Sequence, residues 1–147
     1  MINEKVLVII SKYYKDISEN LLNSAIDFLN QKSIAFDLIE VPGALEIPQA
    51  LNLQINIYKN TEFIYQGCIA LGCVIKGETY HFEIVSNETN SGLMKIALKY
   101  SFPLGNGVIT AYNYKQALTR SFEKGSEAAS ACYELMKIKK NLTADKN

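Results

Sequence analysis

Two side chains that could do chemistry each occur once in the sequence. His81 is the only histidine among 147 residues, and an imidazole is the natural group for proton transfer because it titrates near neutral pH. Arg120 is the only arginine, and a guanidinium can hold a phosphate through two parallel hydrogen bonds. Each has an ordinary alternative, because a histidine in the first turn of a helix often caps it or faces solvent. A lone arginine in a lysine-rich chain is often a surface residue.

A glycine turn, Gly77-Glu78-Thr79, precedes His81 at the point where an apolar run gives way to a helical pattern. Free backbone N–H groups at such a turn, together with the threonine hydroxyl, can face an anion. The same turn is also an ordinary connection between a strand and a helix. Neither a GxxxxGK[ST] nor a GxGxxG motif occurs in the sequence, so the turn alone does not indicate a nucleotide site.

Three further features are weaker as single observations. Tyr13 and Tyr14 follow the first apolar run and could provide a platform for a flat ring, or simply pack at an edge. Glu46 follows a Pro-Gly turn at the start of a helix, where the helix dipole favours a carboxylate in any case. Asn106 lies between two glycines, which by itself favours a tight turn over a ligand contact.

The cysteines and the composition exclude several classes of protein. Cys68, Cys73 and Cys132 form an odd set without a CxxC pair, which favours a reducing cytoplasm with the thiols as small core residues. One histidine leaves almost no basis for a zinc site. Fifteen basic and fifteen acidic side chains give no net charge, which argues against nucleic-acid binding. No apolar run approaches the ~20 residues of a membrane span, and the N-terminus does not resemble a signal peptide.

Strand and helix patterns alternate along what we expect to be a single domain of residues 1–147. The patterns predict strands at 5–10, 33–41, 62–75 and 104–110, and helices around 21–29, 47–58, 85–97, 114–122 and 126–139. Asp16 and Glu19 resemble a capping box for the first helix, Pro48 fits the first turn of the second, and Gly125 separates the last two. Residues 141–147 are expected to form a loose tail.

This alternation predicts a three-layer α/β domain, flavodoxin-like in outline, with a four-stranded parallel sheet flanked by helices. Ligands of such sheets bind beyond the carboxyl ends of the strands. The rule selects four segments, residues 11–14, 41–46, 73–81 and 105–112, and these contain most of the candidates above.

Three blocks in this order, VPGALEIP, GCVIKGETYHFEIV and GNGVIT, closely resemble the 6,7-dimethyl-8-ribityllumazine synthase family of riboflavin biosynthesis. The resemblance extends from about residue 6 to residue 135. It implies condensation of 5-amino-6-(D-ribitylamino)uracil with 3,4-dihydroxy-2-butanone 4-phosphate, with release of phosphate and two waters. It also implies no metal or organic cofactor, two small-molecule substrates, and an active site shared between neighbouring subunits of a homo-oligomer.

The resemblance assigns a role to each site residue. His81 matches the proposed general acid–base. Residues matching contacts to the pyrimidine and its ribityl chain are Tyr13, Ala44, Leu45, Glu46, Cys73, Val74, Ile75, Asn106 and Lys124, with Asn106 supplied by the adjacent chain. Residues matching the site for the butanone phosphate are Glu78, Thr79 and Arg120.

This sequence departs from the family pattern in three places. Tyr14 stands where many relatives have asparagine, and Asn106 replaces a common phenylalanine. The stretch from Arg120 to Gly125 is about four residues shorter, which favours a homopentamer over a sixty-chain shell. Other interpretations are an archaeal-type riboflavin synthase, which would not need a phosphate site, and a flavin- or lumazine-binding protein without activity. A receiver domain lacks support, because no acidic cluster follows the first strand.

Overall fold

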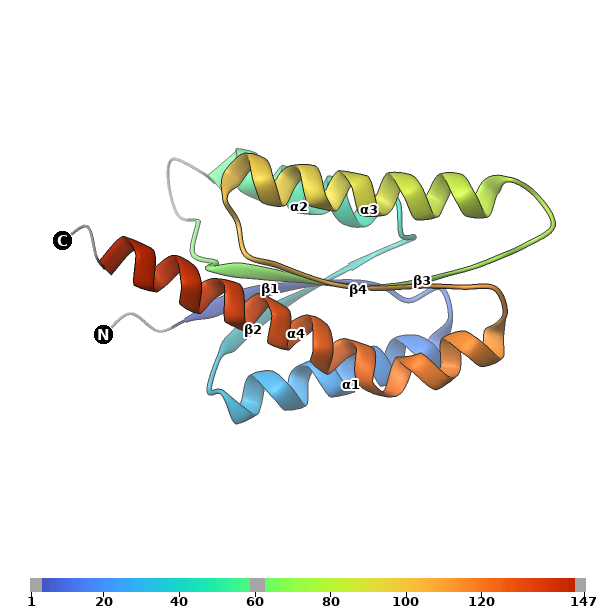
Figure 1. The fold of residues 1–147 in the computed structure, drawn as a ribbon, viewed down its shortest axis with the longest axis horizontal. Coiled ribbons are helices and arrows are strands. Elements are labelled where there is room, and N and C mark those ends of the chain that lie inside the picture. The colour runs from blue at the N-terminus through green and yellow to red at the C-terminus, as the bar shows by residue number, and fades with distance from the viewer. Residues whose placement is uncertain (1–3, 59–62, 145–147) are drawn as a thin grey trace.

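The structure, a computed structural model, describes residues 4–58 and 63–144 of the chain. The strands in these residues are β1 (Lys5–Ser11), β2 (Ala35–Val41), β3 (Gly67–Ile75) and β4 (Leu104–Ala111). They form one sheet in the order β2-β1-β3-β4 (Figure 1). Every neighbouring pair is parallel, as the alternation of strands and helices predicted.

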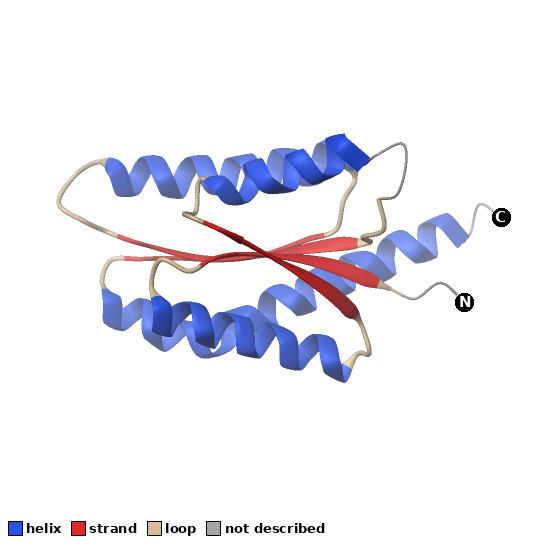
Figure 2. Ribbon diagram, turned by 180° about the vertical axis from the view of Figure 1, so that it is seen from behind, coloured by secondary structure: helices blue, strands red, loops and turns tan. Residues whose placement is uncertain are grey.

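Helices cover both faces of the sheet. The pair α1 (Lys15–Gln31) and α4 (Tyr114–Ala144) packs on one face, and the pair α2 (Glu46–Tyr58) and α3 (His81–Tyr100) packs on the other (Figure 2). This arrangement confirms the predicted three-layer α/β fold, and the strand order is that of a flavodoxin-like sheet.

The core lies on either side of the two central strands. Almost every residue of β1 and β3 is buried, which explains their continuous apolar sequence, because helices cover them from both sides. Alternate residues point to opposite faces, so Val8 and Ile10 pack toward α1 and α4, whereas Leu7 and Ile9 pack toward α2 and α3. The two layers together hold the carboxyl ends of β1 and β3 in fixed positions.

The last part of the chain is one helix, which corrects the predicted pair at 114–122 and 126–139. Helix α4 runs without interruption through Gly125. Gly125 is buried against α1, and a Cβ at this position would collide with the carbonyl of Leu21 and the hydroxyl of Ser24. The glycine therefore allows two helices to approach closely and does not end a helix. The helix also continues to Ala144, so the predicted tail is wrong for residues 141–144, and 145–147 lie outside the described residues.

Three smaller boundaries also differ from the prediction. The N-cap of α1 is Tyr14, which makes no side-chain capping bond, so the predicted capping box is wrong. Asp16 lies in the first turn instead, where a carboxylate still interacts favourably with the helix dipole. Strand β2 begins at Ala35, and β3 begins at Gly67. The predicted start of the third strand, Glu62, lies outside the described residues. Pro48 is in the first turn of α2, as predicted.

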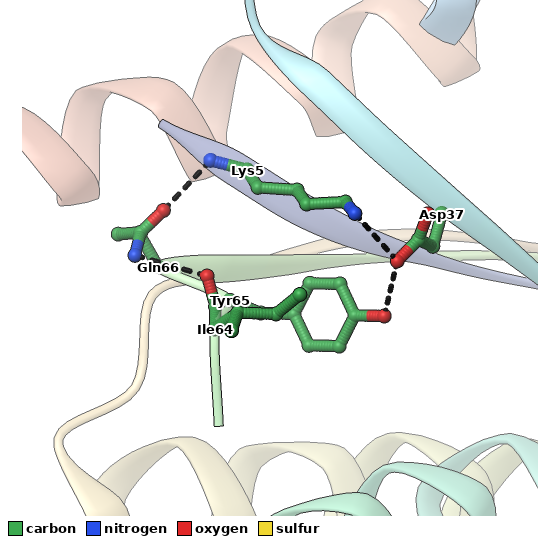
Figure 3. Close-up of polar contacts among 5 residues, drawn as sticks. All are labelled: Lys5, Asp37, Ile64, Tyr65 and Gln66. Carbon is green, nitrogen blue, oxygen red and sulfur yellow. Dashed lines mark hydrogen bonds and ion pairs between the residues drawn. The ribbon is translucent and has the colours of Figure 1, made fainter. Parts of the chain in front are cut away.

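Polar contacts tie the strands together at the end of the sheet remote from the strand carboxyl ends (Figure 3). The Lys5 ammonium lies 3.0 Å from the Asp37 carboxylate, which also accepts a hydrogen bond from the Tyr65 hydroxyl at 2.5 Å. These two partners, the tyrosine first, lower the pKa of Asp37. Burial and Asp37 raise the pKa of Tyr65 to about 12. The Lys5 amide donates to the side-chain oxygen of Gln66 at 2.7 Å, so β1, β2 and the residues before β3 are joined at one place.

Candidate active site

A pocket of about 340 Å³ lies where β1 and β3 end and α2 and α3 begin. This is the edge of a parallel sheet at which ligands bind. The predicted site residues that line the pocket are Tyr13, Ala44, Leu45, Glu46, Cys73, Val74, Ile75, Thr79 and His81. The sheet therefore brings together residues from three separate segments of the sequence.

The connection from β2 to α2 forms one wall of the pocket. Its turn is closed by hydrogen bonds from the Glu46 amide to the Gly43 carbonyl (3.2 Å) and from the Ile47 amide to the Ala44 carbonyl (3.1 Å). A Cβ on Gly43 would lie 3.0 Å from the Glu46 carboxylate, so the glycine leaves room for that carboxylate beside the turn. The wall thus offers a hydrogen-bond acceptor suited to the hydroxyl groups of a ligand.

The turn from β3 to α3 presents unpaired backbone amides. Lys76 donates its amide hydrogen to the Ala111 carbonyl at 2.9 Å, but the amides of residues 77–79 donate no hydrogen bond to any described residue. Gly77 and Thr79 line the pocket, whereas Glu78 is exposed and does not. Free amides directly before a long helix are a favourable position for an anion.

His81 is the first residue of α3 and is exposed at the mouth of the pocket. Its backbone amide makes a long hydrogen bond of 3.4 Å to the Thr79 hydroxyl oxygen. Its imidazole has no hydrogen bond or ion pair with any other residue in the described part of the chain. Both ring nitrogens are therefore available to a ligand.

Two tyrosines and a thiol, those of Tyr13, Tyr14 and Cys73, also line the pocket. The rings of Tyr13 and Tyr14 meet edge to face with centroids 5.0 Å apart, and the ring of Tyr114 also lies near that of Tyr14, with centroids 6.3 Å apart. Burial, followed by the neighbouring Cys73 and Tyr13, raises the pKa of Tyr14. Burial also raises the pKa of Cys73 to about 12. The thiol is therefore protonated at neutral pH.

Arg120 and Lys124 lie elsewhere, in a separate hollow of about 490 Å³ between α4 and the outer side of the edge strand β4. We call it the β4 hollow; it is lined by Val108, Ile109, Thr110, Thr119, Arg120, Glu123, Lys124 and Glu127. The Arg120 guanidinium is exposed and donates one hydrogen bond to the Gln116 carbonyl at 3.1 Å. Within a single chain, the only arginine thus does not line the pocket that contains the histidine.

Asn106 also lies outside the pocket. It is a residue of β4, so the alternative that it forms a tight turn is wrong. Its side-chain amide donates to the Asn90 oxygen of α3 at 2.8 Å, and its own oxygen accepts the Val108 amide at 2.9 Å. These bonds hold the side chain on the surface of the edge strand.

Two pocket residues, Phe82 and Val85, lie outside the four predicted segments, and Ser11 and Gly43 lie within them but were not assigned a role. Val85 lies one helical turn after His81, so helical spacing alone could have placed it on the same side of α3. The part of the chain that the structure describes contains no group of three or more His, Cys, Asp or Glu side chains able to hold a metal ion. It also contains no helix with the length and apolar character needed to cross a membrane.

Comparison with known proteins places the chain in a family. Residues 3–140 match the family described as 6,7-dimethyl-8-ribityllumazine synthase. A protein of that name from Afipia carboxidovorans is 42% identical over 94% of this chain and 87% of its own length. Proteins of the same name from Agrobacterium fabrum (41% identical, 93% and 95% covered) and Bartonella bacilliformis (40%, 95% and 92%) are similarly related. A match of this extent means that the chain belongs to the 6,7-dimethyl-8-ribityllumazine synthase family.

Proposed function

We propose that this chain condenses 5-amino-6-(D-ribitylamino)uracil with 3,4-dihydroxy-2-butanone 4-phosphate to give 6,7-dimethyl-8-ribityllumazine, phosphate and two waters. The amine of the pyrimidine forms an imine with the ketone, phosphate is eliminated, and the second amine closes the ring. The observation that carries the proposal is the pocket itself. It combines a stacking aromatic residue, a carboxylate, unpaired amides before a helix and a free imidazole.

The pocket offers a distinct wall for each part of the pyrimidine substrate. Tyr13 is three-quarters exposed, so one face of its ring is available for the pyrimidine to stack on. Residues 73–75 line another part of the pocket, where their backbone can supply hydrogen-bonding groups for the ring edge. Ala44, Leu45 and Glu46 border the remaining side, where the carboxylate suits the hydroxyl groups of the ribityl chain.

The turn before α3 suits the phosphorylated substrate. The amides of residues 77–79 and the Thr79 hydroxyl can hold phosphate oxygens at the positive end of the helix dipole, with Glu78 contributing its backbone. His81 lies two residues further on, within the same pocket. It can carry the protons that imine formation and phosphate elimination move between the two substrates.

The remaining site residues support an active site built from two chains. Arg120 and Lys124 lie on α4 in the β4 hollow, and Asn106 lies on β4, all of them outside the pocket of their own chain. A head-to-tail contact that brings the β4 edge of one chain to the pocket of the next would add the guanidinium to the phosphate site. Contacts of this kind close into rings when the rotation permits. We expect a cytoplasmic homopentamer, with a sixty-chain shell as the alternative assembly.

The test is to mix the purified protein with both substrates and to follow lumazine absorbance and phosphate release together. Equal amounts of lumazine and phosphate are expected. Formation of riboflavin from lumazine, or binding of lumazine without turnover of the two substrates, would instead support the alternative functions. Light scattering on the same sample measures the mass of the assembly. A mass near one megadalton would contradict the pentamer and support the sixty-chain shell.

A further inference from the structure

A second cavity lies at the end of the sheet remote from the candidate active site. It has a volume of about 630 Å³ and is bordered by four aromatic side chains (Phe63, Tyr65, Tyr100 and Phe102) and by the last turns of α4. We call it the aromatic cavity. It shares no lining residue with the candidate active site or with the β4 hollow. Its volume is typical of sites for small molecules, and the proposed reaction makes no use of it.

Three of the aromatic rings are held at steep angles to one another. The ring of Phe63 meets that of Tyr65 with centroids 5.7 Å apart and planes inclined by 77°. The same ring meets that of Phe102 at 5.6 Å and 58°. Phe102 is buried, whereas Phe63 and Tyr65 are half-buried and line the cavity. A flat aromatic ligand can pack against such rings in the offset or edge-to-face geometry that aromatic pairs prefer.

The polar side chains beside these rings are already bonded within the protein (Figure 3). The Tyr65 hydroxyl donates to the Asp37 carboxylate. The Gln66 side chain accepts the Lys5 amide hydrogen at 2.7 Å and donates to the Ile64 carbonyl at 3.0 Å. These bonds join the strands, so a polar group on a ligand has to be met elsewhere in the lining.

Two lysines of α4 supply charged groups to the aromatic cavity. Met136, Lys139 and Lys140 follow one another at helical spacing and all line it. Met136 is the last buried residue of the helix, so the turns beyond it lie beside the cavity without contributing to the core. The Lys139 ammonium donates to the Ser101 carbonyl at 2.9 Å. The Lys140 ammonium has no hydrogen bond or ion pair with a described residue.

The acidic residue of the lining is Glu4, directly before β1. Among the described residues its carboxylate forms no ion pair, so neither lysine is neutralised by it. An anionic group on a ligand is attracted by the two ammonium groups and repelled by Glu4. A ligand with one charged end and one flat end therefore has a defined orientation in the cavity.

We propose that the aromatic cavity binds a small aromatic anion, with its ring against Phe63 and Tyr65 and its negative group at Lys139 and Lys140. This is a second ligand site, and it does not depend on the proposed reaction. The bound molecule joins the end of α4 to the residues that precede β3.

The test uses two fluorescent probes of nearly the same shape. 8-Anilinonaphthalene-1-sulfonate is an aromatic anion, and N-phenyl-1-naphthylamine has the same rings without the charge. Each probe is titrated into the assembled protein, and the thermal midpoint is measured alongside. Lys140→Met removes one charge from the cavity. Lys137→Met is the matched control, because Lys137 lies on the same helix outside the lining and pairs with Glu134 at 3.2 Å.

We expect the wild type to bind the anionic probe saturably, at one site per chain. Lys140→Met should raise the Kd of this probe by roughly 3- to 10-fold, as for the loss of one exposed charged contact. The Kd of the neutral probe and the thermal midpoint should not change. Phe63→Ala should weaken both probes, because it removes a ring from the cavity, whereas Lys137→Met should weaken neither.

An unchanged Kd of the anionic probe in Lys140→Met, or equal increases in Lys140→Met and Lys137→Met, would overturn the inference. A probe bound only in the candidate active site would give the unchanged value. Absence of saturable binding to the wild type would also overturn it, and would indicate that another chain covers the cavity in the assembly. No substrate is present in these titrations, so their outcome is independent of the proposed function.

Discussion

His81 is the residue on which the chemistry of the pocket depends most directly. Replacing it with alanine removes the only imidazole of the chain, so we expect kcat to fall by about 10²-fold, the lower end of the range for a proton-transfer group. The two substrates would still be held together and would condense slowly. The side chain is exposed and forms no hydrogen bond or ion pair with another described residue, so the thermal midpoint should not change. Steady-state kinetics with both substrates would measure the effect, and an unchanged kcat would remove His81 from the mechanism.

Gly77 tests the anion site independently of His81. Its φ is not positive, and a Cβ on it would meet no atom within 4 Å, so alanine fits the free protein without strain. A phosphate held by the surrounding amides would meet that methyl group. We therefore expect Gly77→Ala to keep the wild-type thermal midpoint while weakening inhibition by inorganic phosphate. Glu78→Ala is a matched control, because its exposed side chain does not line the pocket. Equal inhibition by phosphate in Gly77→Ala and the wild type would show that the anion binds at a different place.

At the scale of the elements, Gly125 decides how closely α4 can approach α1. Alanine has the higher helix propensity by about 1 kcal/mol, which would stabilise an exposed helix. Here the added methyl collides with the Leu21 carbonyl, and overpacking of this kind costs roughly 1–3 kcal/mol. We expect Gly125→Ala to lower the free energy of unfolding, as measured by urea denaturation. Asn141→Ala, at an exposed position of the same helix, should not lower it. A more stable Gly125→Ala would show that the two helices can separate without penalty.

Gly125 also shows which features of the fold could not be predicted from the sequence. Apolar runs and helical spacing predicted four parallel strands and the fold, because burial on both faces leaves a continuous pattern in β1 and β3. Those patterns are local. Whether Gly125 ends a helix or packs against another depends on a contact with Leu21, more than 100 positions earlier in the sequence. The capping box predicted at Asp16 is also wrong, because the N-cap of α1 is Tyr14, which makes no side-chain capping bond.

The part of the candidate site that is built from a single chain could be predicted from the sequence. Strand ends of a parallel sheet meet at one edge, and this rule predicted the contribution of Tyr13, Glu46 and His81 to a common pocket. The rule also selected the segment with Asn106, whose side chain is bonded to Asn90 instead. The position of a residue along a strand does not indicate whether its side chain contributes to the pocket or lies on another surface of the molecule. The placement of Arg120 stays a prediction that involves a second chain.

At the scale of the whole molecule, His81 and Arg120 lie in separate hollows of one chain. We therefore predict that two inactive variants, one lacking each residue, restore activity when they assemble together. His81→Ala and Arg120→Ala chains should each have low activity. If they are mixed as unfolded chains and refolded together, some contacts pair an intact pocket with an intact β4 hollow. Random mixing gives such a contact at about one quarter of the interfaces of a head-to-tail ring. We therefore expect about a quarter of wild-type activity to return.

Separately refolded variants, mixed only at the assay, serve as the control and should stay inactive. If the jointly refolded sample is no more active than this control, each active site is built from a single chain. The hollow at β4 would then have no part in catalysis.

The pairing of β1 with β3 has a consequence for how a newly made chain folds. The contact between Lys5 and Gln66 joins positions 61 apart, and β1 pairs along its other edge with β2. Translation must therefore complete β3 before the middle of the sheet can close. Until then one apolar edge of β1 remains open, and closing the intervening loop costs chain entropy before any contact is gained. This interval during synthesis is when aggregation competes most strongly with folding.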